Sequence, residues 1–152
     1  MKLYYPPSPG GRRAMRRLPC FHPVPVKARA DGWTHQRQAA FIGYLAQTGC
    51  VATAARLVCM GRESAYRLRR RPGAAGFAAA WDAALGKSHA GVDLTSAKAT
   101  GLPASYRFAH GLLKVVMERG RLVKIQRKQD DNALLQHLGQ CDRARTGGAA
   151  TG

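Results

Sequence analysis

The sequence feature that most restricts the fold is the stretch VATAARLVCMGRESAYRLRRR at residues 51–71. Apolar and small residues recur in it at helical spacing, and Cys-Met-Gly interrupts the pattern halfway. Ala54 and Ala55 are small enough to let two helices cross at close range. We therefore predict one helix over residues 51–58 and a second from residue 62 to about residue 70.

The two segments fit the spacing of a helix-turn-helix, in which a short turn holds two helices together. With Ala55 at the small fifth position, the apolar positions of the motif are occupied by Ala54, Val58, Met60, Ala65 and Leu68. The ninth position needs a left-handed backbone, and it is Cys59 where glycine is favoured. A side chain in that conformation costs on the order of 1 kcal/mol, which a fold can tolerate. The alternative is an alanine-rich helical hairpin that only packs.

Helical patterns also flank this pair. Thr34 is a suitable N-cap for a helix that runs to about Gln47, with Arg37 and Gln38 available to solvent. A further helix is predicted over residues 74–85, and its core-facing stripe is formed by Phe77, Trp81 and Leu85. Together with the pair between them, these segments predict a bundle of about four helices.

The C-terminal part of the chain combines strand and helix patterns. An apolar run at residues 112–117 and an alternating basic and apolar run at residues 121–126 predict a β-hairpin with one basic face. A last helix is predicted from Asp130 to about Gly139, with acidic residues at its positive end. The expected fold class is therefore mainly α, a helix-turn-helix bundle followed by a small β-hairpin and a C-terminal helix.

Composition suggests how the chain is divided. Six of the eight prolines lie in the first thirty residues, where they block regular structure among several arginines. We expect a disordered basic arm at 1–30, a helix-turn-helix domain at 31–85, a linker at 86–103, a helix, hairpin and helix subdomain at 104–140, and a disordered tail at 141–152.

Net charge is the strongest global property. The chain has 25 Lys and Arg against 8 Asp and Glu, which gives +17 spread over its whole length. Such a field repels itself unless a polyanion offsets it, and nucleic acid is the usual polyanion. The alternative is an arginine-rich composition that follows from GC-rich coding. RNA is a weaker candidate than DNA because the stacking aromatics typical of RNA-binding modules are absent.

Candidate contact residues lie in the second helix of the pair and in the N-terminal arm. Guanidinium groups can bind phosphates or pair bidentately with guanine, and Arg69 points away from the face shared by the other arginines. The predicted DNA-binding residues are Arg62, Ser64, Tyr66, Arg67, Arg70 and Arg71 in the helix, and Arg12, Arg13, Arg16 and Arg17 in the arm. For the helix the alternative is a solvated basic face, and Tyr66 can equally cover the edge of the core.

The run TGCVATAARLVCMGRESAYRLRRRPGAAGFAAAWDAAL is similar to a group of small alphaproteobacterial helix-turn-helix proteins. Some of these resemble the DNA-binding part of phage small terminase subunits. The resemblance covers residues 33–85 and continues more loosely toward the C-terminus, and it implies binding to double-stranded DNA. This chain departs from the pattern in the turn, with Cys59 in place of glycine and Gly61 in place of serine. The second change removes a capping oxygen.

The leading prediction is a cytoplasmic protein that binds double-stranded DNA and regulates transcription. Two alternatives stay open: a small-terminase-like recognition subunit for DNA packaging, which would form a homo-oligomer, and a helical protein–protein adaptor. No secretory signal or membrane span is expected. No zinc-type cysteine pair, phosphate loop or catalytic triad is found, so we expect no enzyme activity, metal, cofactor or small-molecule substrate.

Overall fold

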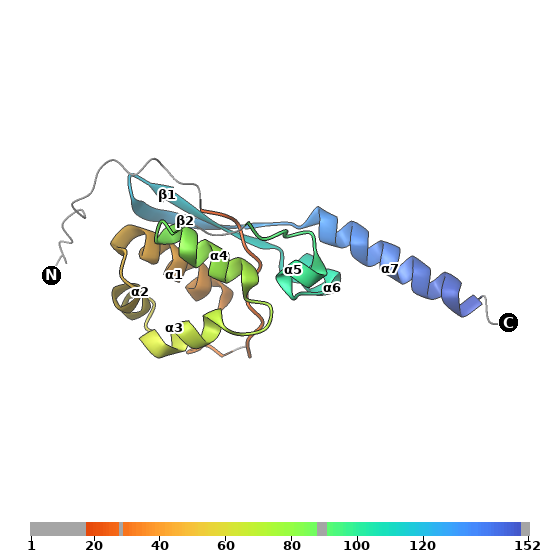
Figure 1. The fold of residues 1–152 in the computed structure, drawn as a ribbon, viewed down its shortest axis with the longest axis horizontal. Coiled ribbons are helices and arrows are strands. Elements are labelled where there is room, and N and C mark those ends of the chain that lie inside the picture. Colours follow the sequence, from red (N-terminus) through yellow and green to blue (C-terminus); the bar gives the residue numbers. More distant parts are fainter. Residues whose placement is uncertain (1–17, 28, 88–90, 150–152) are drawn as a thin grey trace.

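Helices surround one apolar core in the computed structural model, which describes residues 18–27, 29–87 and 91–149 (Figure 1). A two-stranded antiparallel hairpin and a long last helix follow, so the predicted fold class is confirmed. The elements are α1 (His35–Thr48), α2 (Val51–Leu57), α3 (Arg62–Arg69), α4 (Ala75–Ala84), α5 (Ala97–Thr100), α6 (Ala104–His110), β1 (Leu112–Glu118), β2 (Arg121–Lys128) and α7 (Asp131–Ala149).

The central element is α1, which packs on α2 and α4 and on both strands. Its N-cap is Thr34, whose hydroxyl oxygen accepts a hydrogen bond from the backbone N–H of Arg37 at 3.2 Å. Its C-terminal end is Gly49, whose φ of 69° needs the left-handed conformation that glycine adopts without strain. Both predicted ends of this helix are therefore confirmed to within one residue.

The helix-turn-helix forms as the spacing predicts. Four of its five apolar positions are buried, and Met60 is partly buried against the same core. The backbone N–H of Met60 donates to the carbonyl oxygen of Ala55 at 2.9 Å and closes the turn. Cys59 has a φ of 60°, so the ninth position is left-handed although it carries a side chain.

The strain at Cys59 leads to a stability prediction. Because Cys59 is exposed, its side chain contributes little packing, and Cys59→Gly should stabilise the fold by about 0.5–1 kcal/mol in a urea unfolding experiment. Cys59→Ala is the matched control, since it removes the thiol but keeps the strained Cβ. Equal gains from both variants would assign the effect to the thiol and contradict a strained turn.

Residues 18–27, which precede α1, are ordered, and this corrects part of the expected disordered arm. Phe21 exchanges two backbone hydrogen bonds with Leu113 of β1, at 2.8 and 3.2 Å, and its ring is fully buried. Gln38 was predicted to face solvent, but it is fully buried. Its amide oxygen accepts a hydrogen bond from the N–H of Val24 at 2.7 Å, and its amide nitrogen donates one to the carbonyl of Val24 at 3.1 Å. Prolines prevent regular structure here, but they do not prevent burial.

The hairpin lies against α1 and shares the core of the helices. Its strands are joined at Arg119 and Gly120, whose φ values of 53° and 76° match the two-residue turn that suits twisted strands. Alternate residues of β1, Leu113, Val115 and Met117, lie on the core side. In β2 the register shift between Val116 and Met117 places Leu122 and Ile125 on the same side. The hairpin therefore stabilises the helix-turn-helix unit directly.

Two further expectations are wrong. The segment at 86–103, expected as a linker, contains α5 and two buried residues, Thr100 and Leu102. The expected disordered tail is helical as far as Ala149, because α7 continues past Gly139. An isolated glycine costs a helix only about 1 kcal/mol, so it does not have to end one.

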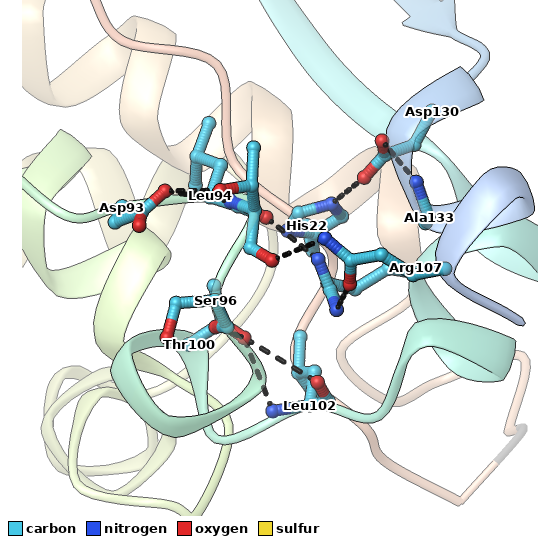
Figure 2. A network of polar contacts seen from close by, with 11 residues as sticks. His22, Asp93, Leu94, Ser96, Thr100, Leu102, Arg107, Asp130 and Ala133 are labelled. Carbon is cyan, nitrogen blue, oxygen red and sulfur yellow. Dashed lines mark hydrogen bonds and ion pairs between the residues drawn. The ribbon is translucent and has the colours of Figure 1, made fainter. Parts of the chain in front are cut away.

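A buried polar network joins the N-terminal segment to α6 and α7 (Figure 2). Asp130 accepts a hydrogen bond from His22 Nε2 at 2.7 Å and caps α7 through the backbone N–H of Ala133 at 3.0 Å. Arg107, which is 0% exposed, donates to the carbonyl of Leu94 at 3.0 Å and to Gln136 at 2.6 Å. These hydrogen bonds hold together four segments that are distant in sequence: the N-terminal segment at His22, the loop at Leu94, α6 at Arg107 and the start of α7.

The burial of two histidines, His22 in this network and His35 at the start of α1, predicts a loss of stability in acid. Burial lowers the pKa of His22 more than its hydrogen bond to Asp130 raises it, and burial followed by the charge of Arg127 lowers the pKa of His35. The unfolded chain therefore takes up protons near pH 6.5 that the folded chain resists, so stability is complete above about pH 6.5 and falls below it. Thermal unfolding between about pH 7.5 and 5.5 should show this slope.

A variant separates the contribution of His22 from that of other groups. His22→Gln keeps a polar side chain but does not titrate, so its unfolding temperature should fall less steeply with pH than that of the native chain. An unchanged slope in this variant would mean that His22 is not the group responsible.

No helix among the described residues is both long and apolar enough to cross a membrane.

Candidate nucleic-acid interface

Arg69 is bound within the protein and positions α3 on α4. Its guanidinium donates to both carboxylate oxygens of Asp82, at 2.8 and 3.1 Å, and lies 5.3 Å from the ring centroid of Trp81. A bidentate pair of this kind is geometrically specific, so it fixes the rotation of α3 about its own axis. The prediction that Arg69 differs from its neighbours is consistent with this position.

Arg67, Arg70 and Arg71 are exposed at the C-terminal end of α3. The ion pairs within the described part of the chain are His22–Asp130 and Arg69–Asp82, so none of the three is paired with a carboxylate there. Three guanidinium groups within five residues give a dense positive charge, and none of them forms an ion pair with a carboxylate of the described structure. They are free to bind a phosphate or a base edge.

The N-terminal half of α3 is held more firmly. Ser64 is half-buried, and its hydroxyl oxygen accepts a hydrogen bond from Trp33 Nε1 at 2.7 Å. Tyr66 packs on Trp81 with ring centroids 5.2 Å apart, and the guanidinium of Arg62 lies 5.8 Å from the Tyr66 ring. Ser64 and Tyr66 therefore sit at the edge of the core, where they orient the helix, and Arg62 is the exposed cation at its start.

Glu63 is a candidate contact that the sequence interpretation missed. It is exposed in the first turn of α3, one helical turn before Arg67, and no ion pair joins the two side chains. The first residues of a helix placed in the major groove reach the base edges, and a carboxylate there can accept a hydrogen bond from cytosine N4. The predicted contacts were cations and neutral polar residues, so an acidic residue was not among them.

The hairpin carries a second basic surface, which is separate from α3. The strand register puts Lys114, Lys124 and Lys128 on the face turned away from the core. In Figure 1 the hairpin lies on the other side of α1 from α3. The two basic surfaces therefore face different surroundings, and a straight segment of duplex seated on α3 would not be expected to reach both.

The remaining predicted contacts, Arg12, Arg13, Arg16 and Arg17, lie outside the described residues. Within the described part, no three His, Cys, Asp or Glu side chains gather as metal ligands. The structure thus brings together one basic face, formed by Arg62, Arg67, Arg70 and Arg71 around the exposed side of α3.

Fold and site together define a mainly α-helical protein with a helix-turn-helix. The second helix of this motif is α3, and Arg62, Arg67, Arg70 and Arg71 on it or directly after it form no ion pair within the described structure. Comparisons with protein-family models, curated proteins and solved structures found no match. The resemblance to small alphaproteobacterial proteins stays a prediction.

Proposed function

We propose that this protein binds double-stranded DNA through α3 and acts as a transcriptional regulator. The observation that carries the proposal is the difference between neighbouring arginines at the C-terminal end of α3. Arg69 is engaged by Asp82, whereas Arg67, Arg70 and Arg71 are exposed and pair with no carboxylate among the described residues. An exposed guanidinium without a carboxylate partner is available to a phosphate or a base edge.

The arrangement suggests how the contacts are shared along the helix. With α3 in the major groove, Arg62 and Glu63 at its start and Arg67 in its last turn can approach base edges. Arg70 and Arg71 follow the helix and suit the phosphates that border the groove. Base contacts would supply the sequence preference, and phosphate contacts would supply most of the affinity.

Duplex DNA fits better than single-stranded nucleic acid. Proteins that bind single strands present exposed aromatic rings on which bases stack. Here the large exposed apolar side chains of the described residues are Leu57, Val123, Leu135 and Leu138, none of which is aromatic. The tyrosine of α3 is itself packed on Trp81.

Selection from a random duplex library at near-physiological salt tests the proposal. Sequence-specific reading by α3 predicts that a short motif is enriched over successive rounds. If the protein retained duplexes but no sequence motif was enriched, it would bind only the DNA backbone, and the proposed regulatory role would be wrong. No retention at all would point to the protein–protein adaptor.

Salt dependence gives a second, quantitative prediction. If Arg70 and Arg71 each neutralise a phosphate, the affinity should fall about 10-fold between 50 and 200 mM salt, because each contact releases counterions. Fluorescence anisotropy with a labelled duplex measures this slope. An affinity that hardly changes over that range would contradict an electrostatic interface.

A further inference from the structure

The last helix leaves one face without a partner. Its inner side is anchored, since Ala133 is fully buried and Gln136 bonds Arg107 and the carbonyl of Thr95. On the outer side, Leu135 and Leu138 are 67% and 51% exposed, the two most exposed leucines among the described residues. Beyond them α7 runs away from the rest of the molecule (Figure 1).

The outer part of α7 needs support from another surface. All side chains of residues 140–146 are exposed, so this half of the helix buries none of them against the described part of the chain. A helical segment of fewer than about 12 residues is marginal in water, because helix stability in proteins comes mostly from packing. Two glycines at positions 147 and 148 weaken it further. A partner that covers the exposed leucines would supply the missing packing.

The charges on α7 point to a second copy of the same chain. Asp131, Leu138 and Arg145 are separated by seven residues each, so they lie on one face of the helix. Asp131 is one heptad before Leu138, and Arg145 is one heptad after it. All three are exposed. The face therefore carries Asp131 at one end, Leu138 at the centre and Arg145 at the other end, with Asp142 one turn after Leu138.

We propose that two copies pair through antiparallel α7 helices, with the twofold axis at Leu138. Each Asp131 then lies level with Arg145 of the other copy, about 10 Å from the axis on either side. Leu135 lies level with Cys141 of the other copy, and the two Leu138 side chains meet at the axis. Leu135 and Leu138 of both copies are therefore covered by the partner helix. In a parallel pair, each Asp131 would instead lie beside the Asp131 of the other copy, and each Arg145 beside the other Arg145, so that like charges repel each other. This inference does not rest on DNA binding.

Sedimentation equilibrium of the full chain without DNA, at about 0.15 M salt, tests the interface. The expected mass is about twice the 16.4 kDa of one chain. Leu138→Glu places two carboxylates across the axis and should raise the dimer dissociation constant at least about 10-fold. Gln140→Glu, with the same charge change on another face of α7, should leave it within about 3-fold.

Charge exchange identifies the antiparallel arrangement. Asp131→Arg and Arg145→Asp should each weaken the dimer, and the double variant should recover it, because the attractive pair is restored in reverse. Without recovery in the double variant, the antiparallel register is wrong. A native chain that stays monomeric at tens of micromolar, or a dimer that Leu138→Glu does not weaken, would overturn the proposal.

Discussion

Replacing Arg107 by methionine should destabilise the fold by about 3–5 kcal/mol, the largest loss we expect from a single change. Methionine keeps most of the volume of the side chain but none of its donors. The carbonyl of Leu94 and the amide oxygen of Gln136 would each lose the hydrogen bond that Arg107 makes. An acceptor left without its partner inside the protein costs about 1–3 kcal/mol.

Urea unfolding followed by circular dichroism measures this loss. Arg121→Met is the control, because Arg121 is exposed on the hairpin and the same chemical change there should have little effect. Since typical domains are stable by about 5–15 kcal/mol, the Arg107 variant should lose a large part of its total stability. A loss below about 1 kcal/mol would mean that the network of Figure 2 is not a structural anchor.

Local signals made the helices predictable. Thr34 and Gly49 bound α1 through their own chemistry, and the apolar spacing in α2 and α3 places the buried residues of the turn. The left-handed Cys59 was predictable because the motif demands that conformation whatever residue occupies it. The helical periodicity also separated Arg69 from Arg67, Arg70 and Arg71. These inferences depend on neighbours within one or two turns.

Long-range pairings were not predictable in the same way. His22 and Asp130 are 108 residues apart, and nothing near either residue in sequence indicates the other. The hydrogen bond from Trp33 to Ser64 likewise turns a predicted DNA contact into an anchored residue. Gln38 carries a polar side chain on a helix, which normally indicates solvent, and only the buried backbone of Val24 explains its burial. Such contacts depend on which segments meet in space.

The largest functional effect is expected at the end of α3. Replacing Arg67, Arg70 and Arg71 together by glutamine should weaken binding to a selected duplex at least about 100-fold, because each lost contact is worth about 1–3 kcal/mol. All three side chains are exposed and pair with no carboxylate of the described structure, so the fold should be unaffected. Circular dichroism and the urea midpoint of the variant check that expectation.

The hairpin supplies the matched control. Replacing Lys114, Lys124 and Lys128 by glutamine removes the same charge from the surface across α1, and it should cost less than about 10-fold in affinity. The two variants should also differ in the slope of log affinity against log salt: only the α3 variant should lose about two units, one for each phosphate contact of Arg70 and Arg71. Equal losses would mean that the net charge of +17 attracts DNA without a defined site. A larger loss from the hairpin variant would move the DNA to that face and leave α3 as an ordinary packing helix.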